Sequence, residues 1–194
     1  EPNSGTVKLD GYTQVRLGKV GFMPQKDVLL PWRTVLDNVI LGLELMGCSH
    51  KLACNKALAL IQMFGLGGSE RRFPATLSGG MKQRAALLRT VLADQDPILL
   101  DEPFGALDAL TRGRLQEWML EVWDSLGKTI VLITHDVEEA ILLSDRVYVL
   151  STRPARVKLI VDVDLPRPRS YKMVTGDSLV NLKGLLLDSL EQDY

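Results

Sequence analysis

The chain has 194 residues, of which 46% are hydrophobic and 24% are charged, and its formal net charge is −1. This length and this balance indicate an ordinary soluble globular protein with one sizeable core. The net charge near zero argues against a nucleic-acid-binding protein that relies on bulk positive charge. No apolar run approaches the ~20 residues that span a bilayer, and the first residues lack a signal-peptide pattern, so we expect a cytosolic protein.

Two short strands are predicted near the start of the chain. Residues 6–9 alternate in polarity and end at the turn formed by Asp10 and Gly11. Residues 19–23 form the second strand and bring Gln25 to its end. The neutral amide of Gln25 can ligate a metal ion or make hydrogen bonds without changing the local charge. The alternative interpretation is a solvated loop glutamine.

A proline and a tryptophan precede the first predicted helix. Pro31 disfavours a helical conformation at the residue before it. Thr34 with Asp37 resembles the capping pair of a helix with apolar positions from Val35 to Leu43. Trp32, which stands beside Pro31, either packs inward or forms a surface on which a partner docks.

The two cysteines, Cys48 and Cys54, flank the start of a second amphipathic helix, which is predicted for residues 50–64. Too few cysteines and histidines accompany them for a disulfide framework or a metal set. We therefore interpret both as reduced thiols without a role in chemistry, and we expect His50 to be solvated.

A serine and two glycines open the next helix. Ser78 is a good N-cap residue, and Gly79 and Gly80 leave the first amide N–H groups of the helix unobstructed. A phosphate group can therefore approach the positive end of this helix. A Ser-Gly-Gly sequence by itself is also typical of a simple turn.

A short apolar run, residues 98–102, ends in two acidic residues, Asp101 and Glu102. It is too brief for a helix, and we predict a buried strand that carries both carboxylates to the C-terminal edge of a parallel sheet. Open α/β sheets place their ligands at that edge. A long helix is predicted to follow, from about Asp108 to Leu126.

A Gly-Lys-Thr sequence at residues 127–129 matches the last three positions of a phosphate-binding G-x-x-x-x-G-K-[ST] loop. Such a loop follows a strand and precedes a helix, whereas here the helix comes first, so we reject this interpretation. Gly127 is better interpreted as a helix C-cap, and Lys128 as a cation at the negative end of that helix. Residues 128–134 predict a buried strand. His135 follows it, at a strand tip comparable with that of the two acids, and is therefore a candidate site residue.

The rest of the chain contains alternating helical and strand patterns. A Pro-Arg-Pro-Arg sequence interrupts them at residues 166–169. The predicted elements are a helix at 137–144, a strand at 146–150, a strand at 157–163 and a helix at 178–192.

Three motifs in this order resemble the ATPase subunits of ATP-binding cassette (ABC) transporters. Residues 77–83 (LSGGMKQ) resemble the signature motif, residues 97–102 (PILLDE) the Walker B strand, and residues 106–108 (ALD) the D-loop. Two further segments resemble the nitrate, sulfonate and taurine importer branch. These are the L-L-P-W-x-T-V-x-x-N-V pattern that begins at residue 29 and the D-L-P-R-P-R sequence at 164–169.

The resemblance implies an α/β fold of the P-loop NTPase type, with a parallel core sheet and a helical subdomain that carries the signature motif. It implies one ABC ATPase domain across residues 1–194, with the helical subdomain at about 29–95. A core from the Walker B strand to the switch histidine would occupy 96–150, and a C-terminal strand and helix 151–194. In this family the P-loop and the adenine-stacking aromatic residue lie upstream of residue 6, and this sequence contains neither. We expect either a fragment or a remnant, and an inactive chain in the form given.

The resemblance also implies how the site works. Two subunits enclose two ATP molecules, and the signature residues Ser78, Gly79, Gly80 and Gln83 of one subunit meet the nucleotide that is bound by the other. Asp108 would connect the two sites across the dimer interface.

On the other face of each ATP, Glu102 would be the general base and Asp101 would hold Mg²⁺, largely through water. Gln25 corresponds to the Q-loop glutamine, which touches Mg²⁺ and the attacking water. His135 corresponds to the switch histidine, which contacts the γ-phosphate. Its side chain is expected to approach that of Glu102.

Pro31 and Trp32 lie where a membrane permease docks in this family. The implied partners are a second ATPase subunit, the permease and, indirectly, a solute-binding protein, with no nucleic acid. The implied location is the cytoplasmic face of the membrane. The function implied is ATP-driven import of a small anion; the alternatives are a soluble ABC-type ATPase that acts on nucleic acid or ribosomes, and a non-catalytic remnant. The solute itself does not follow from the ATPase fold.

Overall fold

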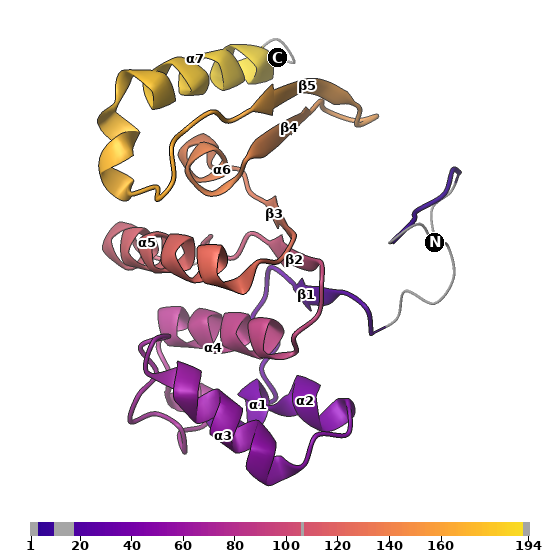
Figure 1. Cartoon of the computed structure of the whole chain (residues 1–194), viewed down its shortest axis with the longest axis vertical. Helices are drawn as coiled ribbons and strands as arrows, with labels where there is room; N and C mark the ends of the chain where they lie inside the picture. Colours follow the sequence, from indigo (N-terminus) through magenta and orange to yellow (C-terminus); the bar gives the residue numbers. More distant parts are fainter. Residues whose placement is uncertain (1–3, 10–17, 106, 192–194) are drawn as a thin grey trace. The chain divides into compact units, whose positions relative to one another are not determined.

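A computed structural model of the chain describes residues 4–9, 18–105 and 107–191. The chain divides into two compact units (Figure 1). The first contains the described residues up to Gly105 together with 128–131, and the second contains 107–127 and 132–191. Two sequence predictions, the turn at residues 10–11 and Ala106 of the D-loop, lie outside the described residues.

A three-stranded sheet has the strand order β1-β2-β3, and the first unit contains β1, β2 and the first half of β3. β1 (Gly21–Met23) and β2 (Ile98–Asp101) are parallel, and Gly21 stands opposite Ile98. β3 (Ile130–Ile133) lies beyond β2. The parallel pairing confirms the predicted α/β fold class, because it places the ends of β1 and β2 at one edge of the sheet.

Two predicted strands differ from the structure. Residues 6–8 have no regular structure and Leu9 forms only an isolated bridge, because the side chain of Val7 is exposed and buries no apolar face. β3 was predicted to be buried, yet Val131 is 47% exposed and Ile133 57%. Val131 and Ile133 are two positions apart in β3 and therefore point to the same face of the strand, and the described residues leave this face largely uncovered.

The helices of the first unit pack around α4 (Gly79–Leu92). This helix contacts β1 on one side and the three preceding helices on the other (Figure 1). Those helices are α1 (Val35–Val39), α2 (Leu41–Leu45) and α3 (His50–Ile61). A single helix was predicted for residues 35–43. The structure instead divides it at Ile40, whose backbone (φ −81°, ψ −7°) closes a turn while its side chain is fully buried.

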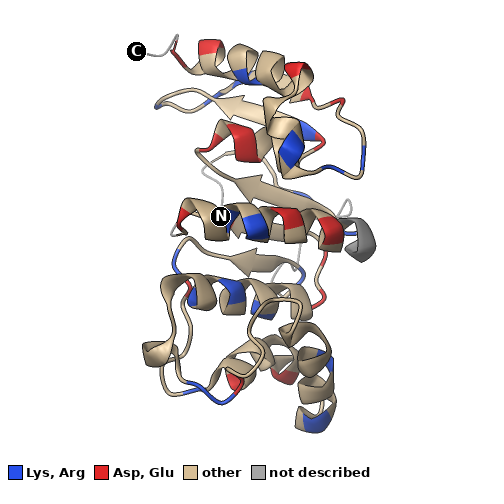
Figure 2. Cartoon of the chain, turned by 90° about the vertical axis from the view of Figure 1, so that its left-hand side faces the viewer, with Lys and Arg blue, Asp and Glu red and all other residues tan. Residues whose placement is uncertain are grey.

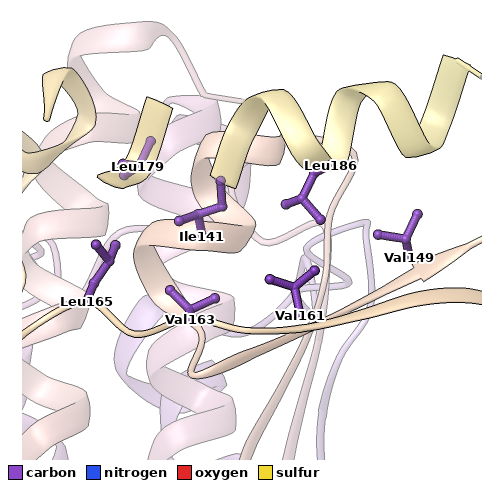
Figure 3. Close-up of a cluster of buried hydrophobic side chains, with 7 residues drawn as sticks. All are labelled: Ile141, Val149, Val161, Val163, Leu165, Leu179 and Leu186. Atoms are coloured by element: carbon purple, nitrogen blue, oxygen red, sulfur yellow. The ribbon is translucent and has the colours of Figure 1, made fainter. Parts of the chain in front are cut away.

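The second unit is built on an antiparallel hairpin of β4 (Arg146–Leu150) and β5 (Val157–Asp162). α7 (Asp177–Glu191) and α6 (Val137–Leu143) pack against each other. Apolar side chains from these elements and the segment after β5 form one buried cluster (Figure 3), made of Ile141, Val149, Val161, Val163, Leu165, Leu179 and Leu186. Burying each such side chain contributes about 1.5–3 kcal/mol, so this cluster stabilises the packing of the hairpin with α6 and α7.

The Pro-Arg-Pro-Arg sequence places a buried guanidinium group at the C-terminal end of α6. Arg169 donates from Nη1 to the carbonyl oxygen of Ser144 at 2.7 Å and from Nη2 to that of Val163 at 3.1 Å. Its Nη2 also lies 3.3 Å from a carboxylate oxygen of Asp145. A buried charge is tolerated when it is paired and hydrogen-bonded in this way, so the motif has a structural reason in this chain.

α5 (Ala109–Leu126) also belongs to the second unit and ends at Gly127, whose φ of 59° and ψ of 29° confirm the predicted C-cap. Lys128 does not complement the helix end as predicted. Its ammonium group lies 2.6 Å from the carboxylate of Asp94 and 3.2 Å from the carbonyl oxygen of Gln95, because an ion pair is available in the first unit.

Basic and acidic residues are interspersed along the elements of each unit, and α5 carries both signs (Figure 2).

Candidate active site

The ends of β1 and β2 bring together two side chains that are 77 residues apart. Gln25 follows β1, and its Nε2 donates a hydrogen bond of 2.9 Å to Oε2 of Glu102, which follows β2. Asp101, the last residue of β2, is partly buried beside them. The parallel register produces this arrangement, because it carries both strand ends to the same edge. The hydrogen bond leaves the carbonyl oxygen of Gln25 available as an acceptor or ligand.

The backbone at Glu102 is strained. Its φ is +46°, a left-handed conformation that is uncommon for a residue with a side chain and that is found at turns and at active sites. Gly105 donates its amide hydrogen to the carbonyl oxygen of Glu102 at 3.2 Å, which closes the turn. A Cβ atom at Gly105 would lie 3.3 Å from Oε2 of Glu102, so a glycine here keeps space for the carboxylate.

The signature segment forms the predicted capped helix start. Ser78 is the N-cap of α4, and its Oγ accepts a 3.3 Å hydrogen bond from the amide of Met81. The hydroxyl proton of Ser78 can still be donated to an anion. No atom outside the neighbouring residues lies within 4 Å of a Cβ built at Gly79, so the first turn is open at that position, and Gly80 continues it. This arrangement suits a phosphate at the helix N-terminus.

Gln83, which was predicted to contact nucleotide, is buried inside the first unit. Its Nε2 donates a 2.7 Å hydrogen bond to the carbonyl oxygen of Pro103, the residue after Glu102. In this structure Gln83 therefore links α4 to the turn after Glu102. Its contact with nucleotide across a dimer stays a prediction.

Two predicted site residues lie in the second unit. Asp108 is the N-cap of α5 and accepts a 3.0 Å hydrogen bond from the amide of Thr111, and the bonds to Thr111 lower the pKa of its carboxyl group. His135 is exposed and precedes Asp136, which caps α6. Arg112 connects these two segments, because it donates to the carbonyl oxygen of Leu107 at 3.1 Å and lies 3.5 Å from Oδ2 of Asp136. His135 lies in the second unit and Glu102 in the first, so the expected approach of their side chains stays a prediction.

The loop that carries Pro31 and Trp32 is held by a buried side chain. Asn38 is fully buried; its Oδ1 accepts from the amide of Leu30 at 2.7 Å, and its Nδ2 donates to three carbonyl oxygens of the loop at 2.9–3.1 Å. Trp32 is 72% exposed, so the loop presents it outward rather than packing it in the core. Thr34 caps α1 and pairs with Asp37 as predicted.

Sequence reasoning missed the roles of Asn38, Arg89 and Arg112. Arg89, on α4, donates to the carbonyl oxygens of Asp27 and Val28 at 2.8 Å each and so fixes the segment after Gln25. Burial of its guanidinium group lowers the pKa of Arg89. The asparagine in the L-L-P-W-x-T-V-x-x-N-V pattern was a local signal, whereas the bonds of Arg89 and the ion pair of Arg112 with Asp136 join residues that are distant in sequence.

We expect Asn38→Ala to lower the free energy of unfolding by about 1–3 kcal/mol, because backbone groups of the loop lose their partner in a buried position. Urea denaturation of the chain and the variant measures the difference. Asn181→Ala, at an exposed position of α7, is the matched control and should have little effect. If the Asn38 variant and the unmodified chain have the same free energy of unfolding, Asn38 does not hold this loop in place.

Gln25 follows one of two parallel strands, and Asp101 and Glu102 stand at the end of the other. Together with a serine-capped helix opened by glycines, this arrangement fits an ATPase domain of the ATP-binding cassette class. The sequence pattern of the ABC transporter family matches residues 1–105. The chain therefore belongs to the ABC transporter family, as its motifs indicated.

Relatives of known name agree with this membership. The chain is 42% identical over 178 residues to the formylaminopyrimidine import ATP-binding protein ThiZ of Halalkalibacterium halodurans, with 92% of this chain and 69% of that protein covered. It is 41% identical over 179 residues to the nitrate import ATP-binding protein NrtD of Synechocystis sp., with 89% and 67% covered. The chain thus spans about two thirds of the length of these relatives. Import ATP-binding proteins of this kind confirm the resemblance to the predicted branch.

A solved structure confirms the fold. The chain superimposes with a TM-score of 0.73 and 27% identity on a dimeric ATP-binding cassette in a post-hydrolysis state, bound to ADP and Pi. The match covers 86% of this chain and 76% of that one. In the described parts of the chain, no helix has the length and apolar character of a membrane span.

Proposed function

We propose that this chain is part of the ATP-hydrolysing subunit of an importer, which powers the passage of a small anion such as nitrate, a sulfonate or taurine through a membrane permease. The observation that supports it best is the 2.9 Å hydrogen bond between Gln25 and Glu102 at adjacent strand ends. This bond orients a carboxylate that is suited to act as a general base on water. The names of relatives that import nitrate and formylaminopyrimidine support the importer class.

The residues at the strand ends fit a magnesium ion. The carboxylate of Asp101 and the amide oxygen of Gln25 are hard oxygen donors, and Mg²⁺ is commonly held by one or two such groups together with substrate phosphates. Among the described residues, no group of three or more His, Cys, Asp or Glu side chains is placed to hold a metal ion. When bound, Mg²⁺ would neutralise charge on the phosphate oxygens.

The signature segment supports a dimer of ATPase subunits. Ser78 and the amides of Gly79 and Gly80 form an exposed helix start with a hydroxyl proton to donate. In the proposed dimer these groups stabilise the γ-phosphate of the ATP that the second subunit holds, where negative charge spreads during the reaction. Asp108 then lies at the interface between the subunits, and His135 contacts the γ-phosphate.

In the proposed complex, Trp32 and Pro31 contact the permease, and the ATPase subunits sit peripherally at the cytoplasmic face of the membrane. A solute-binding protein delivers the solute to the permease. The test is to reconstitute the full-length protein with its permease in vesicles and to measure ATP-dependent uptake of nitrate, taurine and a sulfonate. Uptake of at least one of them supports the proposal, and ATP hydrolysis with no uptake of any would overturn the assignment of the solute class.

Trp32→Ala is expected to uncouple ATP hydrolysis from uptake in that reconstituted transporter. The tryptophan is the large exposed side chain of a loop that Asn38 holds rigid, so its removal deletes contact area with little loss of fold. Uptake per ATP hydrolysed is the quantity to measure, with Tyr171→Ala as the control at another exposed aromatic residue. If Trp32→Ala leaves this ratio unchanged, the loop is not the contact with the permease.

A further inference from the structure

Four side chains of the first unit form a continuous chain of hydrogen bonds away from the strand ends. Sγ of Cys54 lies 3.4 Å from Nε2 of His50, both on α3. Nδ1 of His50 lies 3.0 Å from Oε1 of Glu44, on α2. The other carboxylate oxygen of Glu44 accepts a 2.7 Å bond from Nη1 of Arg33. The sequence interpretation of Cys54 as a thiol without chemistry, and of His50 as merely solvated, did not foresee this arrangement.

The contacts of Glu44 determine which nitrogen of His50 carries the proton. The hydrogen bonds from His50 and Arg33 lower the pKa of Glu44, so its carboxyl group is ionised and accepts hydrogen bonds only. Nδ1 of a neutral His50 must therefore carry a hydrogen, and the lone pair of Nε2 then faces the thiol of Cys54. A thiol, an imidazole base and an orienting carboxylate in this order are the components of an activated sulfur nucleophile.

We propose that Cys54 is a thiol modification site, at which His50 is the base, Glu44 orients and stabilises the imidazole, and the reactant is a low-molecular-weight disulfide. The thiol proton passes to Nε2 of His50 as Sγ attacks one sulfur of the disulfide. The bond between the two reactant sulfurs breaks, a mixed disulfide forms on Cys54, and the imidazolium returns the proton to the departing thiolate. The reaction converts one thiol and one disulfide into one mixed disulfide and one thiol, with no external oxidant.

The charges around the thiol explain why the base is needed. Burial, followed by the carboxylates of Asp37 and Glu44, raises the pKa of the Cys54 thiol. The resting group is therefore the protonated thiol at neutral pH, and only the thiolate attacks a disulfide. The same carboxylate of Glu44 lies 3.0 Å from Nδ1 of His50, where it stabilises the positive charge that forms on the ring when Nε2 takes the proton.

The site is accessible to a small reactant. The side chain of His50 is 63% exposed and Cys54 is partly exposed. Cys48, the second of the two cysteines in the sequence, is also a partly exposed free thiol and serves as an internal reference.

Two single-thiol forms of the 194-residue chain, Cys48→Ser and Cys54→Ser, allow each cysteine to be followed alone. The probe is oxidised glutathione, and mass spectrometry measures the rate at which the mixed disulfide forms at pH 7.5. We expect Cys54 to react at least about tenfold faster than Cys48, a modest share of what a general base can contribute. Equal rates for the two thiols, or a slower Cys54, would overturn the proposal.

His50→Gln in the Cys48→Ser background should remove most of the advantage of Cys54, while Lys51→Gln, at the next and exposed position, should not change it. The pH profile separates a base from a structural residue. The form with His50 should react faster than the His50→Gln form at neutral pH, where the thiol is protonated and needs a base. The two rates should converge as the pH rises towards the raised pKa of the thiol, because the thiolate then forms without a base. Glu44→Gln should lower the rate of mixed-disulfide formation by less than His50→Gln does. If the rate and its pH profile are unchanged in both variants, the roles assigned to His50 and Glu44 are refuted.

Discussion

Glu102→Gln, in a form of the chain extended upstream through a P-loop, is expected to lower the ATP turnover number by about 10²–10⁴-fold, the usual contribution of a general base. The substitution preserves the size of the side chain, and its amide oxygen can still accept the hydrogen bond from Gln25. The geometry of the strand ends should therefore survive while the capacity to take a proton from water is lost. Steady-state phosphate release measures turnover, and equilibrium binding of ATP should stay within a few-fold of the parent protein.

A matched control separates this effect from a general change of charge. Glu117→Gln removes one carboxylate from an exposed position of α5 and should leave turnover unchanged. If Glu102→Gln and Glu117→Gln have the same turnover as the parent, Glu102 is not the base and the proposed mechanism fails.

Local signals predicted those parts of the structure that depend on neighbouring residues. The cap of α4 at Ser78, the pairing of Thr34 with Asp37 and the left-handed Gly127 all follow from interactions within one turn of the chain. Strand β2 and the acids at its end were also predicted, because the apolar run is too short for a helix.

Contacts between distant segments were not predictable in the same way. The buried amide of Asn38 and the guanidinium group of Arg169 acquire their roles from carbonyl oxygens that the fold brings to them. The exposure of Val131 and Ile133 likewise depends on what covers the sheet rather than on their own β propensity. From sequence alone, polar and charged residues are predicted to be exposed to solvent, because the hydrogen-bond partners that bury them come from distant segments.

The candidate site shows the same division. Placing Gln25 and Glu102 at strand ends required only the strand pattern, but their 2.9 Å contact required the parallel register of β1 with β2. Gln83 is similar, because its hydrogen bond to the carbonyl oxygen of Pro103 depends on the packing of α4 and not on its place in the signature motif.

The 194-residue chain by itself is expected to show no measurable ATP turnover, although Asp101, Glu102 and His135 are present. A general base accelerates only a reaction whose substrate is already positioned, and in this family the P-loop amides and lysine provide that positioning. The sequence has no G-x-x-x-x-G-K-[ST] segment between a strand and a helix. Ser78 and the glycines after it cannot replace the P-loop, because in the proposed dimer they serve the opposite face of the nucleotide.

Phosphate release and ATP binding, measured side by side for residues 1–194 and for the form extended through a P-loop, test this expectation. Turnover only in the extended form, lost again in its Glu102→Gln variant, is the expected result. The exposed side chains of Phe22 and Val131 on the sheet should also make the short form the less soluble of the two. Comparable turnover by the short form would show that the residues described above position ATP without a P-loop, and it would overturn the argument that catalysis depends on one.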